Sequence, residues 1–267
     1  MEQPKNNFKL VTDKKNARML LPNMLTLIGV CIGLTSIRFA LSGEFHLAII
    51  AIIFAALIDG LDGRIARLIK GTSKVGKELD SLTDMISFGV APAFIMYFWK
   101  LNTFGRFGWL LCLVYVICVA LRLARFNISS NQEPSWKDNF FEGVPSPAGG
   151  ILVLTPLIIS LSGFEYIKIN YDIIVPVFFI GTSFLLISKF PTYSFKKIVI
   201  QRKATIFLLF TIVLFFGLLL IYTFNVIAIS SIIYLSLIPI SFFHYQKMKK
   251  IHENDKIQDE DDLEDVL

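Results

Sequence analysis

Long apolar runs alternate along the chain with short segments in which charged residues gather. A helix that crosses the hydrocarbon core of a bilayer needs about 20 predominantly apolar residues. Eight apolar runs approach that length, and polar or charged residues bound each of them. The pattern therefore predicts eight membrane-spanning helices, at residues 23–41, 45–65, 82–99, 107–126, 147–163, 171–187, 204–222 and 225–245.

The composition agrees with a membrane protein. Hydrophobic residues make up 54% of the chain and charged residues only 18%, and the mean hydropathy is +0.63. Charge this sparse cannot cover a soluble surface, and the composition excludes disordered, collagen-like and disulfide-rich proteins. Cys31, Cys112 and Cys118 lie inside apolar runs, so we expect neither a zinc site nor a structural disulfide. The expected fold is an all-α polytopic membrane helix bundle.

The positive charges indicate the orientation of the bundle. With the N-terminus placed in the cytoplasm, all but four of the 26 Lys and Arg residues fall in cytoplasmic segments, the exceptions being Arg38, Lys100, Arg106 and Lys168. Cytoplasmic loops carry such an excess in membrane proteins. We therefore expect both termini in the cytoplasm, and the net charge of +5 indicates anchoring beside anionic lipid rather than nucleic-acid binding.

Four aspartates lie where the second predicted span ends and the third begins. Asp59 and Asp62 are three residues apart, and Asp80 and Asp84 are four apart, so each pair shares one helix face. The short turn between the two helices makes them antiparallel neighbours, and their acidic faces can converge just below the inner membrane surface. Ionisable residues at this depth are costly and are by default functional.

Converging carboxylates repel one another unless cations lie between them. The candidate ligands are all oxygen atoms, which favours Mg²⁺, Mn²⁺ or Ca²⁺ over zinc. Four carboxylates suffice for two ions about 4 Å apart, the arrangement used in phosphoryl transfer. The alternative is a pair of ordinary helix ends, where the same aspartates form ion pairs with Arg64, Arg67 or Lys77.

Small residues surround the four acids. Gly63 directly follows Asp62, and Gly76 precedes Asp80 by one helical turn. Backbone exposed at such positions suits a flat base or a diphosphate, and Arg67 can hold phosphate oxygens through two hydrogen bonds. Glycines in membrane helices also serve simply as helix-packing contacts, which is the alternative here.

The segment from residue 59 to 84 reads DGLDGRIARLIKGTSKVGKELDSLTD. It matches the pattern D-x2-D-G-x2-A-R-x8-G-x3-D-x3-D in full, and in this pattern the chain resembles the CDP-alcohol phosphotransferase family. The segments LLPNMLTL, SFGVAPAF, LRLARFN and FFEGVPSPAGG are similar to those of family members that use L-serine as the acceptor. The resemblance extends from about residue 20 to residue 150.

The resemblance implies a division of the chain and an assembly. It implies a six-helix catalytic core at residues 23–188, preceded by a basic cytoplasmic segment at 1–22. Two additional C-terminal spans then occupy 189–246. Residues 247–267 form an acidic cytoplasmic tail that we expect to be disordered. The family is typically homodimeric, and a bacterial-type inner or plasma membrane is the expected location.

The resemblance also assigns roles to the acids. Asp59 and Asp80 are expected to bridge two divalent cations, Mg²⁺ or Mn²⁺. Asp62 is expected to hold one ion, and Asp84 to bind the other and to accept the proton of the incoming alcohol. The residues expected to contact the CDP-lipid are Asn23, Thr26, Gly63, Arg67, Ser73 and Gly76.

The acceptor site is less defined by the sequence. Arg122 and Arg125 share a helix face at the cytoplasmic end of the fourth span and are followed by Asn127. A guanidinium there can hold the carboxylate of serine. Anchoring of the span at the membrane surface explains the same arginines equally well.

The activity implied is that of a transferase of phospholipid biosynthesis. It would move the phosphatidyl group from CDP-diacylglycerol to the hydroxyl of L-serine, giving phosphatidylserine and CMP. Glycerol 3-phosphate or inositol phosphate as the acceptor remains an alternative, because the acids handle only the CDP end. A cation transporter and a structural membrane protein are more distant alternatives, since no charged residues continue across the bilayer from the acids.

Overall fold

The computed structural model describes residues 14–69, 73–129, 140–163, 170–193 and 202–264. They form helices and one two-stranded sheet, grouped in two compact units, Met1–Val116 and Ile117–Leu267. The boundary between the units falls within a single helix, α5. The predicted all-α membrane fold is confirmed.

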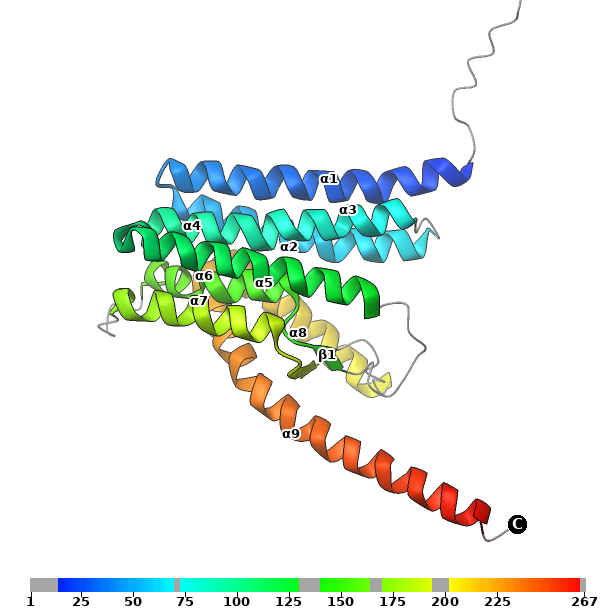
Figure 1. The fold of residues 1–267 in the computed structure, drawn as a ribbon. Coiled ribbons are helices and arrows are strands. Elements are labelled where there is room, and N and C mark those ends of the chain that lie inside the picture. The colour runs from blue at the N-terminus through cyan, green and yellow to red at the C-terminus, as the bar shows by residue number, and fades with distance from the viewer. Residues whose placement is uncertain (1–13, 70–72, 130–139, 164–169, 194–201, 265–267) are drawn as a thin grey trace, which may run out of the picture. The chain divides into compact units, whose positions relative to one another are not determined.

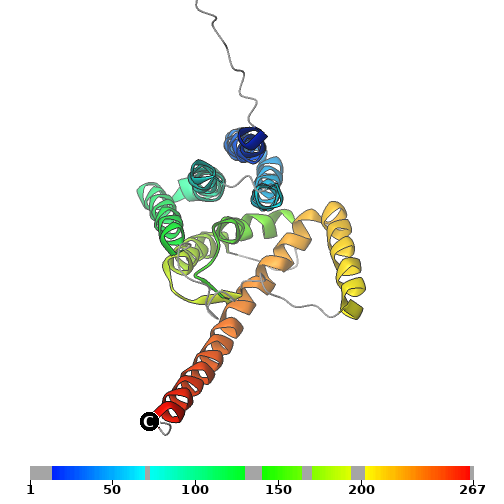
Figure 2. The same ribbon diagram turned by 90° about the vertical axis from the view of Figure 1, so that its right-hand side faces the viewer.

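Antiparallel helices build the first unit (Figure 1). Helix α1 packs along α2 and also contacts α3 and α4, an arrangement seen nearly end-on in Figure 2. The elements of this unit are α1 (Lys14–Leu41), α2 (Phe45–Leu68), α3 (Lys74–Asp84), the π-helical turn η1 (Met85–Val90), α4 (Ala91–Trp99), the 3-10 turn η2 (Leu101–Phe104) and the first half of α5 (Arg106–Ser129).

Small residues let α1 approach the third span closely. A Cβ atom on Gly33 would lie 2.6 Å from Oγ of Ser87 and 3.1 Å from its Cα. The Ser87 hydroxyl also donates a hydrogen bond to the carbonyl of Gly29 at 3.3 Å. Gly29 and Gly33 therefore form a small-x-x-x-small contact of the kind that holds membrane helices together without a hydrophobic driving force. This contact fixes the position of α1 beside the acidic segment.

The third span changes geometry directly after Asp84. Helix α3 ends at this residue, η1 follows, and the N–H of Ala91 bonds the carbonyl of Ile86, five residues back. Pro92 has no N–H to offer the carbonyl of Phe88, and the buried hydroxyl of Tyr115 donates to that carbonyl at 2.7 Å instead. Single π turns inside α-helices frequently occur at functional sites.

The second unit combines helices with a short sheet. Its elements are the second half of α5, β1 (Phe140–Glu142), α6 (Ser146–Leu161), α7 (Tyr171–Ile187), β2 (Pro191–Tyr193), α8 (Arg202–Ile221) and α9 (Thr223–Glu264). The strands pair antiparallel, with Phe141 opposite Thr192. Helix α6 packs against α7 and α9, β2 packs on α9, and α8 contacts α9.

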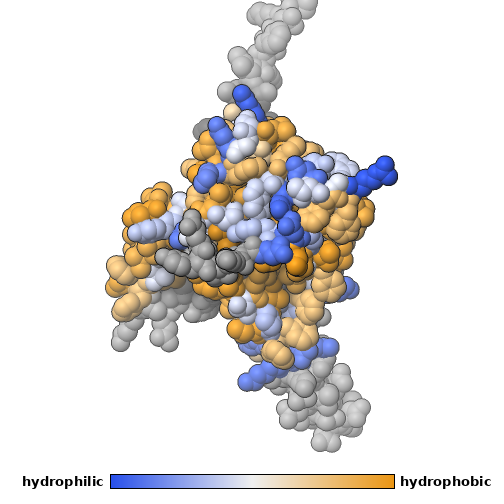
Figure 3. Space-filling view, turned by 90° about the vertical axis from the view of Figure 1, so that its left-hand side faces the viewer, coloured by the Kyte–Doolittle hydropathy of each residue, from blue (hydrophilic) through white to orange (hydrophobic). Residues whose placement is uncertain are grey.

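Each predicted span corresponds to a helical segment of the structure. Five described helices are long and apolar enough to cross a membrane: Leu21–Leu41, Phe45–Leu68, Val75–Trp99, Arg106–Ile128 and Thr223–Lys249. Three shorter apolar helices lie at Ser146–Leu161, Tyr171–Ile187 and Thr205–Ile221. Apolar side chains are exposed on most of these helices, and much of the face drawn in Figure 3 is orange, that is, hydrophobic. Such a surface suits a lipid environment.

Three helix boundaries differ from the expectation. Helix α1 begins at Lys14 rather than residue 23, and the third span begins at Lys74 rather than residue 82. Helix α9 continues to Glu264, although we expected residues 247–267 to be disordered. Hydropathy marks where apolar residues begin and end, but a helix already formed extends at little cost through residues with good helix propensity. Residues 1–13 and 265–267 lie outside the described ranges.

Removing the hydroxyl of Tyr115 is expected to destabilise the first unit. Tyr115→Phe keeps the buried ring but takes the hydrogen bond from the Phe88 carbonyl, a loss of about 1–3 kcal/mol. Thermal unfolding of the purified protein in detergent should therefore occur at a lower temperature. Tyr97→Phe, which preserves the ring contacts with Phe98 and Trp109, is the matched control. An equal effect of both substitutions would contradict the role given to the Tyr115 hydroxyl.

Candidate active site

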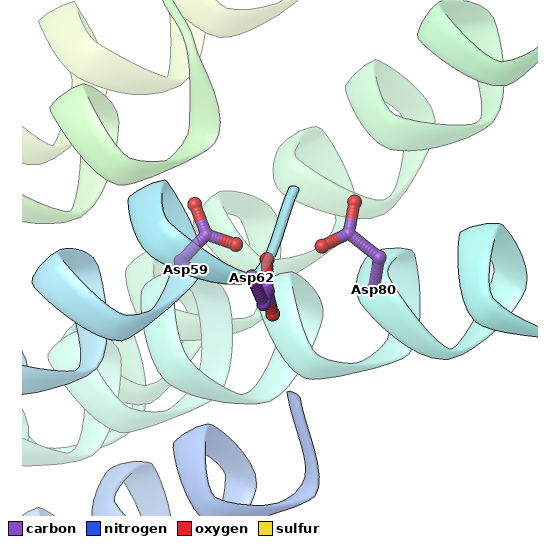
Figure 4. Close-up of side chains that lie close together, drawn as sticks. All are labelled: Asp59, Asp62 and Asp80. Carbon is purple, nitrogen blue, oxygen red and sulfur yellow. The ribbon is translucent and has the colours of Figure 1, made fainter. Parts of the chain in front are cut away.

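Three of the four aspartates converge in the first unit. Asp59 and Asp62 come from α2 and Asp80 from α3, and each offers a carboxylate oxygen, with all three atoms within 4.8 Å of one another. In Figure 4, Asp59 and Asp80 point toward each other from opposite helices, with Asp62 between them. Asp62 is only 4% exposed, and the other two are partly buried.

The fourth aspartate extends this group along α3. Asp84 lies one helical turn beyond Asp80, at the last residue of the helix. Its carboxyl group lies close enough to Asp59 on α2 to interact with it. Helices α2 and α3 thus bring together acids that are 18 to 25 positions apart in the sequence.

The donor set fits divalent cations. It consists of carboxylate oxygens, which suit hard cations such as Mg²⁺ and Mn²⁺. Carboxylates this close repel one another strongly where water is scarce, and a cation between them removes that repulsion. Asp59, Asp62, Asp80 and Asp84 are the residues that would hold such ions.

A threonine from α1 reaches into the acidic group. The Thr26 hydroxyl lies 2.8 Å from Oδ2 of Asp62 and 3.0 Å from the carbonyl oxygen of Pro22. Thr26 is 5% exposed, so this contact is shielded from solvent. Helix α1, which carries none of the four aspartates, therefore contributes directly to the arrangement of one of them.

A cavity of about 430 Å³ opens beside Asp62 and Asp80. Residues from α1, α2 and α3, together with Ser73 at the N-cap of α3, form its wall. The six residues that the sequence pointed to for the CDP-lipid all line it, namely Asn23, Thr26, Gly63, Arg67, Ser73 and Gly76, together with Pro22, Ala66 and Lys77. The structure thus gathers residues from three separate segments around one cavity that two of the acids share.

The N-terminus of α3 forms part of this cavity. Ser73 caps the helix, and its hydroxyl oxygen accepts a hydrogen bond from the N–H of Gly76 at 2.9 Å. A helix N-terminus carries partial positive charge and favours anions. Arg67 and Lys77 add full positive charges to the wall of the same cavity. The cavity therefore joins an acidic side to a positively charged side, as a metal-bound diphosphate requires.

Two glycines of the cavity have different surroundings. A Cβ atom on Gly76 would lie 2.8 Å from Oδ1 of Asn23 and 3.1 Å from Oγ of Ser73. A Cβ atom on Gly63 would meet no protein atom within 4 Å, and it would occupy open space in the cavity. Gly76 is thus needed for packing between side chains, whereas Gly63 keeps room for a ligand.

The arginines expected at the acceptor site belong to the second unit. Arg122 is 6% exposed, and its guanidinium donates to the carbonyl of Val144 and, at 2.9 Å, to Oγ of Ser146. Both partners lie in the FFEGVPSPAGG segment that the resemblance singled out. The structure therefore brings two of the recognised segments together at Arg122.

Arg125 bonds the C-terminal end of α7. It donates to the carbonyls of Ile187 at 2.7 Å and of Leu186 and Ser188 at 3.3 Å. These carbonyls lack partners within their own helix, so the arginine acts as a C-terminal cap. Asn127, two residues further on, is partly buried. The acids and their cavity lie in the first unit, and these three residues lie in the second.

The link between α1 and the acids was not predicted from the sequence. Pro22, Thr26, Gly29 and Gly33 follow one another at intervals of four, three and four residues. That spacing places them on one face of a helix. This stripe of small and polar residues within an otherwise apolar span was the available signal for a contact with the acidic helices.

The chain matches the family model described as CDP-alcohol phosphatidyltransferase over residues 19–238. This match covers most of the chain, including the four aspartates and the residues that line the cavity. The chain belongs to this family. The fold and site described above are thus those of a membrane-embedded member of a family that handles CDP-activated alcohols.

Curated relatives share one name, CDP-diacylglycerol–serine O-phosphatidyltransferase. The protein of Mycobacterium leprae is 43% identical over 175 residues, which cover 64% of this chain and 57% of that protein. The protein of Helicobacter pylori strain 26695 is 37% identical over 201 residues, covering 75% and 83%. That of Bacillus subtilis is 33% identical over 177 residues, covering 66% and 92%. The chain thus spans less than two thirds of the mycobacterial relative.

Alanine substitutions of three glycines test the cavity. Gly76→Ala should displace Asn23 and Ser73, and Gly63→Ala should place a methyl group in the ligand space. We expect Gly76→Ala and Gly63→Ala each to weaken binding of a CDP nucleotide about tenfold, equivalent to about 1.4 kcal/mol. Calorimetric titration with Mg²⁺ present would measure the affinity. Gly60→Ala is the control, because a Cβ atom there also meets nothing within 4 Å and Gly60 does not line the cavity. Equal affinity in all three variants would contradict the assignment of this cavity.

Proposed function

We propose that this protein transfers the phosphatidyl group of CDP-diacylglycerol to the hydroxyl of L-serine, giving phosphatidylserine and CMP. The observation that carries the proposal is the convergence of Asp59, Asp62 and Asp80, two of which, Asp62 and Asp80, line the cavity. The names of the curated relatives support serine as the acceptor.

The cavity residues bind and orient the CDP group. Arg67, Lys77 and the N-terminus of α3 hold the diphosphate, and Gly63 leaves room for the nucleotide. Asn23 and Thr26 reach the nucleotide from α1. When bound by the four aspartates, Mg²⁺ or Mn²⁺ neutralises the diphosphate and stabilises charge on the leaving CMP phosphate.

Asp84 serves as the proton acceptor. It takes the proton of the serine hydroxyl as the oxygen attacks the phosphorus on the lipid side of the diphosphate. The bond from that phosphorus to the bridging oxygen breaks, and CMP leaves with the electron pair. A direct displacement of this kind needs no covalent enzyme intermediate.

Arg122, Arg125 and Asn127 are proposed to bind the carboxylate of serine. A guanidinium presents five N–H donors in a planar fork that matches a carboxylate. The bonds of Arg122 to Val144 and Ser146 hold its guanidinium in one orientation, which favours recognition of a planar carboxylate.

The proposed setting is a bacterial-type inner or plasma membrane. Both termini and the active site face the cytoplasm, in line with the distribution of Lys and Arg. This side supplies both serine and a route for the release of CMP. The working unit is proposed to be a homodimer.

An acceptor screen tests the activity. Purified protein in detergent would receive CDP-diacylglycerol and Mg²⁺ or Mn²⁺, with L-serine, glycerol 3-phosphate or inositol phosphate offered in turn. We expect CMP release that requires serine and stops on addition of a chelator, measured by nucleotide chromatography. Release with glycerol 3-phosphate or inositol phosphate but not with serine would replace the proposed acceptor, and release unaffected by chelation would contradict the role of the acids.

Substitution of the proton acceptor gives a second test. Asp84→Asn should reduce turnover by at least about 100-fold, because general-base catalysis contributes about 10²–10⁴-fold, while CDP-diacylglycerol still binds. Asp172→Asn is the matched control, since Asp172 lies in the first turn of α7 in the second unit. Near-normal turnover of Asp84→Asn would rule out the proton-acceptor role.

A further inference from the structure

One contact near the acids is not explained by nucleotide binding. Thr26 and Asp62 belong to different helices and are 5% and 4% exposed, and the Thr26 hydroxyl lies 2.8 Å from Oδ2 of Asp62. A buried carboxylate needs hydrogen-bond donors to remain charged away from water. The contact is therefore important for Asp62 whether or not a nucleotide is present.

The Thr26 hydroxyl has one proton and two acceptors within reach. The carbonyl of Pro22, at 3.0 Å, lies four residues back in the same helix, where it is also the ordinary partner of the Thr26 N–H. The Asp62 carboxylate is closer, at 2.8 Å, and hydrogen bonds to a charged acceptor are about twice as strong as neutral ones. The hydroxyl therefore donates mainly to Asp62.

The backbone that carries Thr26 is itself fixed. One turn further along α1, a Cβ atom on Gly29 would lie 3.2 Å from Cγ2 of Thr83, and the Gly29 carbonyl accepts from Ser87. Thr83 and Ser87 lie on either side of Asp84 in the third span. Because α1 is held against the span that carries Asp80 and Asp84, the hydroxyl of Thr26 fixes Asp62 relative to those two acids.

We propose that Thr26 is a positioning residue for the metal site, which holds the Asp62 carboxylate in the orientation that binds a divalent cation. This inference rests on the proposed metal-dependent function and adds to it a residue that touches neither the ion nor the reacting atoms. Hydrogen-bond partners of metal ligands typically change metal affinity about 10–100-fold when they are removed.

Binding of Mn²⁺ alone tests the inference without catalysis. The purified full-length protein in detergent would be titrated with Mn²⁺, and free ion measured by electron paramagnetic resonance, with no lipid or nucleotide present. We expect Thr26→Val to weaken Mn²⁺ binding about 10–100-fold and Thr26→Ser, which keeps the hydroxyl, to bind within about threefold of the original protein. Thr155→Val is the control, since the buried Thr155 hydroxyl bonds the carbonyl of Ile151 in α6.

A double substitution separates positioning from loss of fold. In an Asp62→Asn background, Thr26→Val should cause no further loss of Mn²⁺ affinity, because the carboxylate it orients is gone. Unchanged Mn²⁺ affinity of Thr26→Val, equal losses in Thr26→Val and Thr26→Ser, or additive losses in the double variant would each overturn the inference. Absence of Mn²⁺ binding by the original protein would overturn the metal site itself, which is a distinguishable outcome.

Discussion

Mutual repulsion among partly buried carboxylates is the constraint on which the first unit depends. Asp59, Asp62 and Asp80 place oxygen atoms within 4.8 Å of one another at the end of apolar helices, where water cannot screen their charges well. Without a bound cation, such an arrangement persists only if the helices are held together by contacts that do not depend on the acids. The close packing of α1 on the third span supplies such contacts, since it uses glycine and serine rather than charge.

Helix α1 combines support with recognition. Gly29 and Gly33 pack against the third span, and Thr26 contacts Asp62. Nearer the N-terminus of the helix, Pro22 and Asn23 line the cavity. One rigid helix therefore joins the membrane-embedded packing to the ligand cavity. A tilt of α1 would change both the cavity and the orientation of Asp62, so the two properties cannot vary independently.

Local spacing allowed much of the site to be predicted from the sequence. The i,i+3 and i,i+4 intervals of the acids, with a short turn between the helices, suffice to predict their convergence. The bond between Thr26 and Asp62 was not predictable in this way, because it depends on how α1 rotates about its own axis. Hydropathy located the spans but not the helix ends at Lys14 and Glu264, since helices extend beyond the apolar residues.

The π turn at Met85–Val90 has a consequence for how the third span tolerates changes in length. Successive residues of an α-helix are rotated by about 100°, so deleting one residue within this turn would turn Asp84 away from its partners or rotate the apolar face of α4 out of its packing. Helices α3 and α4 need different rotations about the axis of the third span, and the wider π turn between them provides the difference. The π turn therefore sets the rotation of α4 about the helix axis relative to α3. Asp84 can then face the other acids while the apolar side chains of α4 keep their packing.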